Sequence, residues 1–160
     1  MRIATGIGYD CHQLVPDRKL VIGGVQIAHT HGLLGHSDAD VLTHAIIDAL
    51  LGAAALGDIG QHFPDADERY RDADSLMLLC ETVTLLDALP ATIEHVDATV
   101  IIEAPKLGPY RNQILTRLAE ALAVPPERLS VKATRGEGMG FIGHGEGAAA
   151  LAVATIRRTE

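Results

Sequence analysis

The longest apolar stretch of the chain lies between residues 39 and 56, where alanine, leucine and isoleucine dominate. This composition, with no glycine or proline before Gly52, predicts a helix over 39–56. Ser37 is the expected N-cap, with Asp40 as its acidic capping-box partner, and Gly57 is the expected end. A helix that is apolar on nearly every side is normally buried, so we expect it at the centre of the fold.

Three polar side chains interrupt this apolar helix at intervals of four residues: Asp40, His44 and Asp48. The spacing predicts that they share one face of the helix. Burying such groups is costly unless each is paired or bound to a metal ion. The stripe therefore marks this helix as part of a candidate functional site.

Alternating apolar and polar positions predict the strands. We expect extended segments at 2–13, at 19–28 as a hairpin turning at Gly23-Gly24, at 92–103 and at 129–135. The final segment, 148–158, is ambiguous, because its alanines favour a helix and its end, VATI, favours a strand.

Two further helices are predicted, at 75–89 and at 109–123. Loops are expected at 29–37, at 58–75, which is long and polar, and at 136–147, which is rich in glycine. Because strands and helices interleave and no interdomain linker separates them, we predict an α/β (α+β) fold around a single sheet, in one domain over 1–160.

The net charge of −8 and the aromatic content of 3% argue against nucleic-acid binding, which uses basic surfaces and aromatic stacking. An acidic chain that binds a phosphorylated small molecule needs cations at the site, and metal ions can supply them. Two cysteines are too few for a disulfide scaffold, which favours a reducing compartment. No apolar leader or membrane-length run is present, so we expect a cytoplasmic protein, or a plastid protein if a transit peptide has been removed.

The sharpest chemical constellation combines Asp10 and His12 with His44. Asp10 and His12 are two residues apart in a predicted strand, so their side chains point to the same face. Two imidazoles and one carboxylate are a usual ligand set for Zn²⁺, and three protein ligands leave a fourth position open for substrate. Each histidine alone is more often an ordinary core or surface residue, and that alternative stays open. Asp48 either orients His44 or caps a loop.

Two other groups of residues are candidates for binding a phosphate. His36 and Ser37 lie at the predicted start of the central helix, where N–H groups and the helix dipole favour an anion, unless Ser37 only caps the helix. Thr134 and Arg135 lead into the glycine-rich loop and carry groups that suit a phosphate, and Glu137 could hold Mg²⁺ on it. The alternative is a flexible hairpin with incidental charges.

Five motifs together resemble the 2-C-methyl-D-erythritol 2,4-cyclodiphosphate synthase family over essentially the whole chain. They are Asp10-Cys11-His12, HSDADVLTHAIIDALLGAAALGDIG over 36–60 with FPDAD at 63–67, EAPK at 103–106, VKAT at 131–134, and GFIGHGEG at 140–147. The resemblance implies a homotrimer in which each subunit carries one mixed sheet with helices on one face. The sheets would surround a central cavity, and the active sites would lie between subunits.

The implied reaction converts 4-diphosphocytidyl-2-C-methyl-D-erythritol 2-phosphate into 2-C-methyl-D-erythritol 2,4-cyclodiphosphate and releases CMP. It is a metal-assisted intramolecular phosphoryl transfer in non-mevalonate isoprenoid biosynthesis. Two alternatives are kept: a metal-dependent phosphohydrolase, and a non-catalytic module that binds nucleotides or isoprenoid diphosphates.

By position, the resemblance also assigns roles to individual residues. The implied metal ligands are Asp10, His12 and His44 for one Zn²⁺ per subunit, and Glu137 for Mg²⁺ or Mn²⁺ on the diphosphate. The implied catalytic residues are His36 and Arg135, and Asp48 is expected to support His44. The implied substrate contacts are Asp10, His12, His36, Ser37, Asp58, Ile59, Gly60, Phe63, Pro64, Asp65, Ala66, Asp67, Ile102, Glu103, Ala104, Pro105, Lys106, Leu107, Gly108, Ala133, Thr134, Arg135, Gly136, Glu137, Phe141 and His144.

Three positions differ from the family pattern. Ala39 stands where the family usually has glycine. Arg135 replaces a threonine implicated in stabilising the transition state, and His144 replaces an arginine that faces the cavity of the trimer.

Overall fold

The longest strand, β1 (Arg2–Pro16), points its side chains alternately to two opposite faces. The structure is a computed structural model, and it describes residues 1–159. Gly6 and Gly8 are buried, whereas Ile7 and Tyr9, which point the other way, are 72% and 52% exposed. One face of β1 is therefore covered within the chain and the opposite face is exposed.

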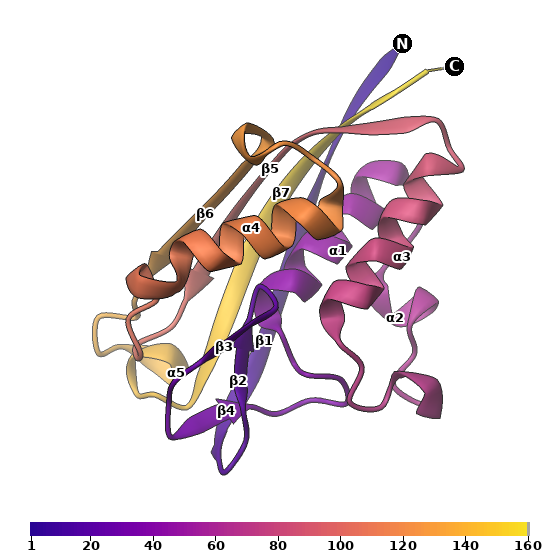
Figure 1. The fold of residues 1–160 in the computed structure, drawn as a ribbon. Helices are drawn as coiled ribbons and strands as arrows, with labels where there is room; N and C mark the ends of the chain where they lie inside the picture. Colours follow the sequence, from indigo (N-terminus) through magenta and orange to yellow (C-terminus); the bar gives the residue numbers. More distant parts are fainter. Residues whose placement is uncertain (160) are drawn as a thin grey trace.

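β1 belongs to a five-stranded mixed sheet in the order β4-β1-β7-β5-β6 (Figure 1). The other strands are β4 (His31–Leu33), β5 (Ala91–Ile101), β6 (Leu129–Thr134) and β7 (Gly147–Arg158). β7 runs antiparallel between β1 and β5. β5 and β6 are parallel, since α4 (Arg111–Leu122) forms the crossover between them.

A small separate sheet pairs β2 (Leu20–Ile22) with β3 (Val25–Ile27). Its turn is made by Gly23 and Gly24, with φ of 58° and 72°. A turn with positive φ at both central residues suits glycine and is the one expected for a two-residue hairpin. The predicted hairpin is confirmed, but it forms a second, two-stranded sheet apart from the main mixed sheet, so the prediction of a single sheet is wrong on this point.

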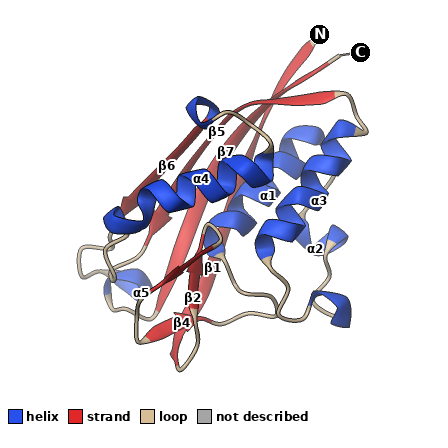
Figure 2. Ribbon diagram, in the orientation of Figure 1, coloured by secondary structure: helices blue, strands red, loops and turns tan. Residues whose placement is uncertain are grey.

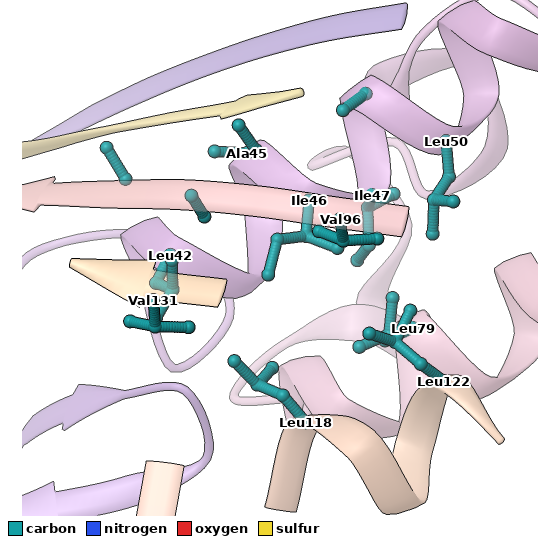
Figure 3. Close-up of a cluster of buried hydrophobic side chains, with 14 of the residues drawn as sticks. Leu42, Ala45, Ile46, Ile47, Leu50, Leu79, Val96, Leu118, Leu122 and Val131 are labelled. Atoms are coloured by element: carbon teal, nitrogen blue, oxygen red, sulfur yellow. The ribbon is translucent and has the colours of Figure 1, made fainter. Parts of the chain in front are cut away.

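The three long helices, α1 (Val41–Ala54), α3 (Ser75–Asp87) and α4, lie on the same face of the main sheet (Figure 2). In the buried core, Ile46 of α1 lies beside Val96 of β5, and Leu42 of α1 lies beside Val131 of β6 (Figure 3). Leu79 of α3 and Leu118 of α4 belong to the same buried cluster. The central helix is buried, as its all-round apolar sequence predicted.

The start of α1 differs from the prediction. The N-cap is Asp40, whose carboxylate accepts a hydrogen bond from the N–H of Thr43, so the prediction of Ser37 as N-cap is wrong. The helix ends before Ala55, whose φ of 59° forms a left-handed C-cap, and Gly57 lies beyond this end.

Four other segments resolve into defined elements. The ambiguous segment 148–158 is strand β7, and the segment 29–37 contains β4. The long loop contains α2 (Ile59–His62) and a 3₁₀ turn (Glu68–Tyr70), and the glycine-rich loop contains α5 (Gly140–Gly143). Two more 3₁₀ turns, Gly108–Tyr110 and Pro126–Arg128, flank α4.

α3 and α4 lie within the two predicted helical ranges. Over residues 1–159, no helix is long and apolar enough to cross a membrane. Cys11 and Cys80 are both free and exposed.

The glycines of β1 allow α1 to lie directly on the strand. A Cβ at Gly6 would lie 2.1 Å from the carbonyl oxygen of Ala49, and one at Gly8 would lie 1.9 Å from that of Ala45. Neither distance can be relieved by a side-chain rotation, because both contacts are to helix backbone. β7 contributes a similarly flat surface of buried alanines, namely Ala148, Ala150, Ala152 and Ala154.

The substitution Gly8→Ala should therefore destabilise the fold by about 3 kcal/mol or more, because the new methyl group pushes α1 away from the sheet. Gly108→Ala is the matched control, since a Cβ there meets nothing within 4 Å, and it should change stability by less than about 0.5 kcal/mol. Urea unfolding of both variants measures the difference. Equal stability of the two variants would contradict the close packing of α1.

Candidate active site

Strand β1 and helix α1 bring the three predicted metal ligands together. The Oδ2 atom of Asp10 lies 2.8 Å from Nε2 of His12 and 3.1 Å from Nδ1 of His44. The two histidine nitrogens are 3.4 Å apart. In the described part of the chain, this is the one group of three or more His, Cys, Asp or Glu side chains close enough to hold an ion.

The spacing of these three atoms fits a transition-metal ion. Ligands about 2.0–2.1 Å from a tetrahedral Zn²⁺ lie roughly 3.3 Å from one another. The observed separations of 2.8–3.4 Å bracket this value, so an ion needs only small side-chain shifts. The side chains of His12, Asp10 and His44 are 19%, 25% and 11% exposed, which leaves an opening for a fourth, external ligand.

Hydrogen bonds outside the centre orient both imidazoles. Nδ1 of His12 lies 2.9 Å from the carbonyl oxygen of Leu34, which can only accept, so Nδ1 carries the proton and Nε2 is left for a metal. Nε2 of His44 lies 2.8 Å from the hydroxyl of Ser75, and its Nδ1 faces Asp10. Each histidine thus presents one nitrogen to the centre and uses the other as an anchor.

The charges at the centre stabilise one another. Burial alone would raise the pKa of Asp10, but hydrogen bonds from His12 and His44 bring it below the ordinary value of 3.8. Burial alone would lower the pKa of His44, but its hydrogen bond to Asp10 and the negative charge there raise it above 6.5. The centre therefore favours a carboxylate with positive charge beside it, and a divalent cation can replace that charge.

The other two members of the predicted stripe do not reach this centre. Asp40 is fully buried at the N-cap, where it accepts hydrogen bonds from the backbone N–H groups of Gly23, Gly24 and Thr43 and from the Thr43 hydroxyl. Asp48 accepts from the N–H of Ile59 at 2.8 Å. Within residues 1–159, no hydrogen bond joins Asp48 to His44, and Asp48 instead holds Ile59, the first residue of α2, against α1.

His36 and Ser37 lie in the segment that leads into α1. Nε2 of His36 donates to the carbonyl of Asp67 at 3.2 Å, and the Ser37 hydroxyl lies 3.2 Å from Nε2 of His44. The prediction that they sit at the helix N-terminus is wrong, because α1 starts at Val41 and its first turn is capped by Asp40. They adjoin the metal centre through the side chain of His44.

The predicted residues after α1 form a polar rim beside His36. Asp58 caps α2 by accepting from the N–H of Gln61 at 3.0 Å, and Asp67 pairs with the exposed Arg69. Phe63 is buried against the ring of Tyr70, at 5.4 Å between centroids. The segment is completed by Ile59, Gly60, Pro64, Asp65 and Ala66, and all of these except Ile59 are exposed.

A second group of predicted residues lines a cavity of about 430 Å³ at the ends of β5 and β6. The cavity walls include the predicted residues Ile102, Glu103, Pro105, Lys106, Leu107, Gly108, Ala133, Thr134 and Arg135. Arg111 and Lys132 also line it, so its lining holds four cationic residues and one carboxylate, Glu103, in a protein whose net charge is −8, although the ammonium of Lys132 is paired with Asp97. This charge pattern suits an anionic ligand with an apolar portion.

The remaining predicted residues lie in and around the glycine-rich loop. The N–H of Gly136 donates to Glu103 at 2.8 Å, which joins the loop to the cavity wall. Glu137 is exposed, with φ of 54°, and Phe141 is 43% exposed. His144 is exposed and lines a different cavity together with Ala104.

Sequence reasoning missed two features of the site. Arg18 donates to the carbonyls of Leu33, Gly35 and Ser37 and so fixes the segment that carries His36 and Ser37. A lone arginine in a turn carries no sequence signal for such a role. Ser75, which contacts His44, is the first residue of the helix predicted over 75–89, a position where a serine suggests helix capping and not contact with a histidine.

The fold and the site together define an α/β protein with a histidine–carboxylate metal centre and a cationic cavity for an anionic ligand. The YgbB family matches residues 3–157. A 2-C-methyl-D-erythritol 2,4-cyclodiphosphate synthase of Alkaliphilus oremlandii is 57% identical over 152 residues, which cover 95% of this chain and 97% of that protein.

Two solved structures share the fold. The bifunctional IspDF from Campylobacter jejuni superposes with a TM-score of 0.95 at 38% identity, covering 99% of this chain and 43% of that one. A CDP-bound 2C-methyl-D-erythritol-2,4-cyclodiphosphate synthase superposes with a TM-score of 0.88 at 35% identity, covering 98% and 100%.

The chain belongs to the 2-C-methyl-D-erythritol 2,4-cyclodiphosphate synthase family. It is an enzyme with that synthase activity, a CMP-releasing lyase of non-mevalonate isoprenoid biosynthesis.

The pKa shifts at the metal centre predict how the stability of chelator-treated protein depends on pH. The raised pKa of His44 gives a contribution that is full below 6.5 and is lost as the pH rises through the folded value. The lowered pKa of Asp10 gives a contribution that is present above 3.8 and is lost at lower pH. The free energy of unfolding of metal-free wild type should therefore exceed that of Asp10→Asn most between pH 3.8 and pH 6.5, and by less at alkaline pH.

Urea unfolding of the two metal-free proteins at pH 5.5 and pH 8.5 measures this difference. Adding Zn²⁺ should reverse the trend for wild type, because metal binding requires the neutral imidazole. A stability difference that does not change with pH would show that the Asp10–His44 pair is not charged in the folded protein.

Proposed function

We propose that Asp10, His12 and His44 hold one Zn²⁺ per chain during the synthase reaction, and that Glu137 holds Mg²⁺ or Mn²⁺ on the substrate diphosphate. The observation that carries the first part is the convergence of three ligand atoms at 2.8–3.4 Å, each histidine having its other nitrogen anchored. The second part rests on the exposure of Glu137 beside the cavity wall and on the family resemblance.

The predicted substrate contacts divide into two groups in this proposal. His36, Ser37 and the rim over 58–67 would hold the methylerythritol phosphate end beside the metal ligands. The walls over 102–108 and 133–137 would hold the cytidine diphosphate end, with Phe141 and His144 at the border. The existence of a CDP-bound relative supports a cytidine nucleotide as ligand, and the cationic residues that line this cavity support its place here.

The reaction is an internal displacement at phosphorus. An oxygen of the 2-phosphate forms a bond to the β-phosphorus, and the bond from that phosphorus to the oxygen bridging it to the α-phosphate breaks, releasing CMP. Catalysis of such a transfer consists mainly of alignment and charge neutralisation. The metal ions would supply positive charge to the phosphoryl oxygens.

The protein's own groups supply the alignment. His36 and Ser37, on a segment fixed by Arg18, would hold the attacking phosphate. Arg135 would contact the diphosphate from the cavity wall, supplying a full charge where the family usually has a threonine hydroxyl. Lys106, on the same wall, would bind the leaving phosphate.

We also propose that the active enzyme is a homotrimer. The sheet face opposite the helices exposes large apolar side chains, namely Ile3, Ile7, Tyr9, Leu151 and Val153. An exposed apolar face of this kind marks an interface. The cavity at β5 and β6 includes none of the three metal ligands among its lining residues, which fits a site completed by a neighbouring copy.

Residues 1–160 would form one domain, because β1 and β7, from opposite ends of the chain, pair from Arg2 with Arg158 to Gln13 with Gly147. A cytoplasmic location, with two reduced cysteines, stays a prediction.

His44→Ala tests the metal proposal. The variant should bind little zinc and release CMP about 100-fold more slowly or worse, because the substrate phosphates lose their charge neutralisation. His29→Ala is the matched control, since His29 is exposed and has no proposed role. Elemental analysis measures zinc, and the assay uses the diphosphocytidyl substrate with Mg²⁺. Full zinc in His44→Ala would reject the ligand assignment, and a linear instead of a cyclic phosphate product would favour a hydrolase.

Ile7→Asp tests the trimer. Ile7 is 72% exposed in the single chain, so the change should leave folding intact but place a charge in the proposed interface. We expect monomers by light scattering and at least about a tenfold loss of CMP release, because alignment between subunits is lost. Met77→Asp is the control, at an exposed methionine of α3. A trimeric Ile7→Asp enzyme would place the interface elsewhere.

A further inference from the structure

The side of His44 that faces away from Asp10 is held by two serine hydroxyls. Its Nε2 atom lies 2.8 Å from Oγ of Ser75 and 3.2 Å from Oγ of Ser37. Ser75 is the first residue of α3 and is fully buried, and Ser37 is 8% exposed. The imidazole is therefore clamped between the segment entering α1 and the start of α3.

The direction of the Ser75 hydrogen bond follows from its neighbours. A hydroxyl has a single proton to donate, and Ser75 donates it to the carboxylate of Asp38. The same carboxylate accepts from the backbone N–H of Ser75 at 2.9 Å. With its proton committed to Asp38, the Ser75 oxygen can only accept from His44.

Nε2 of His44 consequently carries a proton. The lone pair of the neutral ring is then on Nδ1, the nitrogen that faces Asp10 and lies 3.4 Å from Nε2 of His12. If the Ser75 hydroxyl instead donated to Nε2, the neutral ring would carry its proton on Nδ1 and could not bind an ion there. The acceptor strength of Asp38 therefore decides which nitrogen of His44 is available.

We propose that Asp38 and Ser75 are positioning residues of the metal centre, which select the Nε2-protonated form of His44 and aim its Nδ1 lone pair at the ion. This inference rests on the proposal that Asp10, His12 and His44 bind a divalent ion. Partners that hydrogen-bond a ligating histidine typically change metal affinity about 10–100-fold.

Asp38 also couples the metal centre to the segment that carries His36. Its backbone N–H donates to the carbonyl of Ala73 at 3.1 Å, and the N–H of Asp72 donates to the carbonyl of His36 at 2.8 Å. The Asp38 carboxylate further accepts from the N–H of Asp40 at 3.1 Å. Asp38 thus acts in two ways: its carboxylate holds Ser75 against His44, and its backbone belongs to the segment that residues 72 and 73 hold in place.

Ser75→Ala tests the proposal through metal affinity. Competition with a chromogenic zinc chelator should show binding about 10–100-fold weaker than in wild type. The matched control is Thr82→Ala, which removes another buried hydroxyl of α3, one that donates only to the carbonyl of Leu78 at 2.9 Å. Thr82→Ala should bind zinc as wild type does, even where thermal unfolding shows the same loss of stability.

A proton–nitrogen NMR spectrum of the zinc-bound wild type provides a test that needs no variant to fold. The His44 ring should show a hydrogen-bonded proton on Nε2 and a metal-shifted Nδ1. In Ser75→Ala the Nε2 proton should move upfield and exchange faster with water.

The possible failures can be told apart. If wild type binds no stoichiometric zinc, the metal proposal itself fails. If wild type binds zinc but Ser75→Ala binds it equally well, or if the NMR spectrum places the His44 proton on Nδ1, the role of Asp38 and Ser75 is overturned. A loss of affinity equal to that of Thr82→Ala also overturns it, by assigning the effect to general stability.

Discussion

The distance between α1 and the sheet is the constraint on which the rest of the structure depends. At Gly8 the helix backbone lies so close that a methyl group on the strand would meet the carbonyl of Ala45. Ala45 follows His44, and Gly8 lies two residues before Asp10 on the same face of β1. The contact that brings helix and strand together therefore also sets the 3.1 Å between His44 and Asp10. A zinc ion tolerates little variation in the distances between its ligands. The small residues between α1 and β1 therefore allow close packing of the core and also keep His44 and Asp10 at a separation that suits such an ion.

Helix α1 is apolar on almost every side, and its polar groups are satisfied locally instead of by water. Asp40 is fully buried, and burial raises the pKa of its carboxyl group, as does the nearby charge of Asp38. N–H groups from the β2–β3 turn and from the first turn of α1 oppose this shift. In residues 1–159 no buried side-chain nitrogen or oxygen is left without a hydrogen-bond partner. Because the Asp40 carboxylate already caps the first turn of α1, that helix end is not free to bind an anion, which is why the proposed phosphate contacts are His36 and Ser37.

The sequence predicted what depends on local periodicity and on residue chemistry. The apolar run over 39–56, the alternation in β1 and the positive-φ hairpin all act over a few residues, and the structure has each of them. Asp10, His12 and His44 could be grouped because their side chains form a known ligand set.

What the sequence left open depends on contacts across the fold. The strand state of 148–158 follows from its place between β1 and β5, and Asp40 rather than Ser37 is the N-cap because the β2–β3 turn supplies two more donors. The role of Ser75 arises only when α3 is brought against α1, 31 residues away in sequence.

The two faces of the sheet divide the work of the enzyme. On the helix side of β1 the even-numbered residues Gly6 and Gly8 are buried, and they are followed by Asp10 and His12, two of the three side chains that could hold a metal ion. On the other side, Ile7 and Tyr9 alternate with these same residues and remain exposed. Successive side chains of a strand point to opposite faces, so β1 carries Ile7 and Tyr9 on one face and Asp10 and His12 on the other. A subunit interface that includes Ile7 and Tyr9 would therefore have a fixed position relative to Asp10 and His12. The backbone of β1 would then fix where a neighbouring copy docked on that face lies relative to a metal ion held by Asp10 and His12. Such precision is what an in-line transfer needs when the cationic cavity and the metal ligands come from different chains.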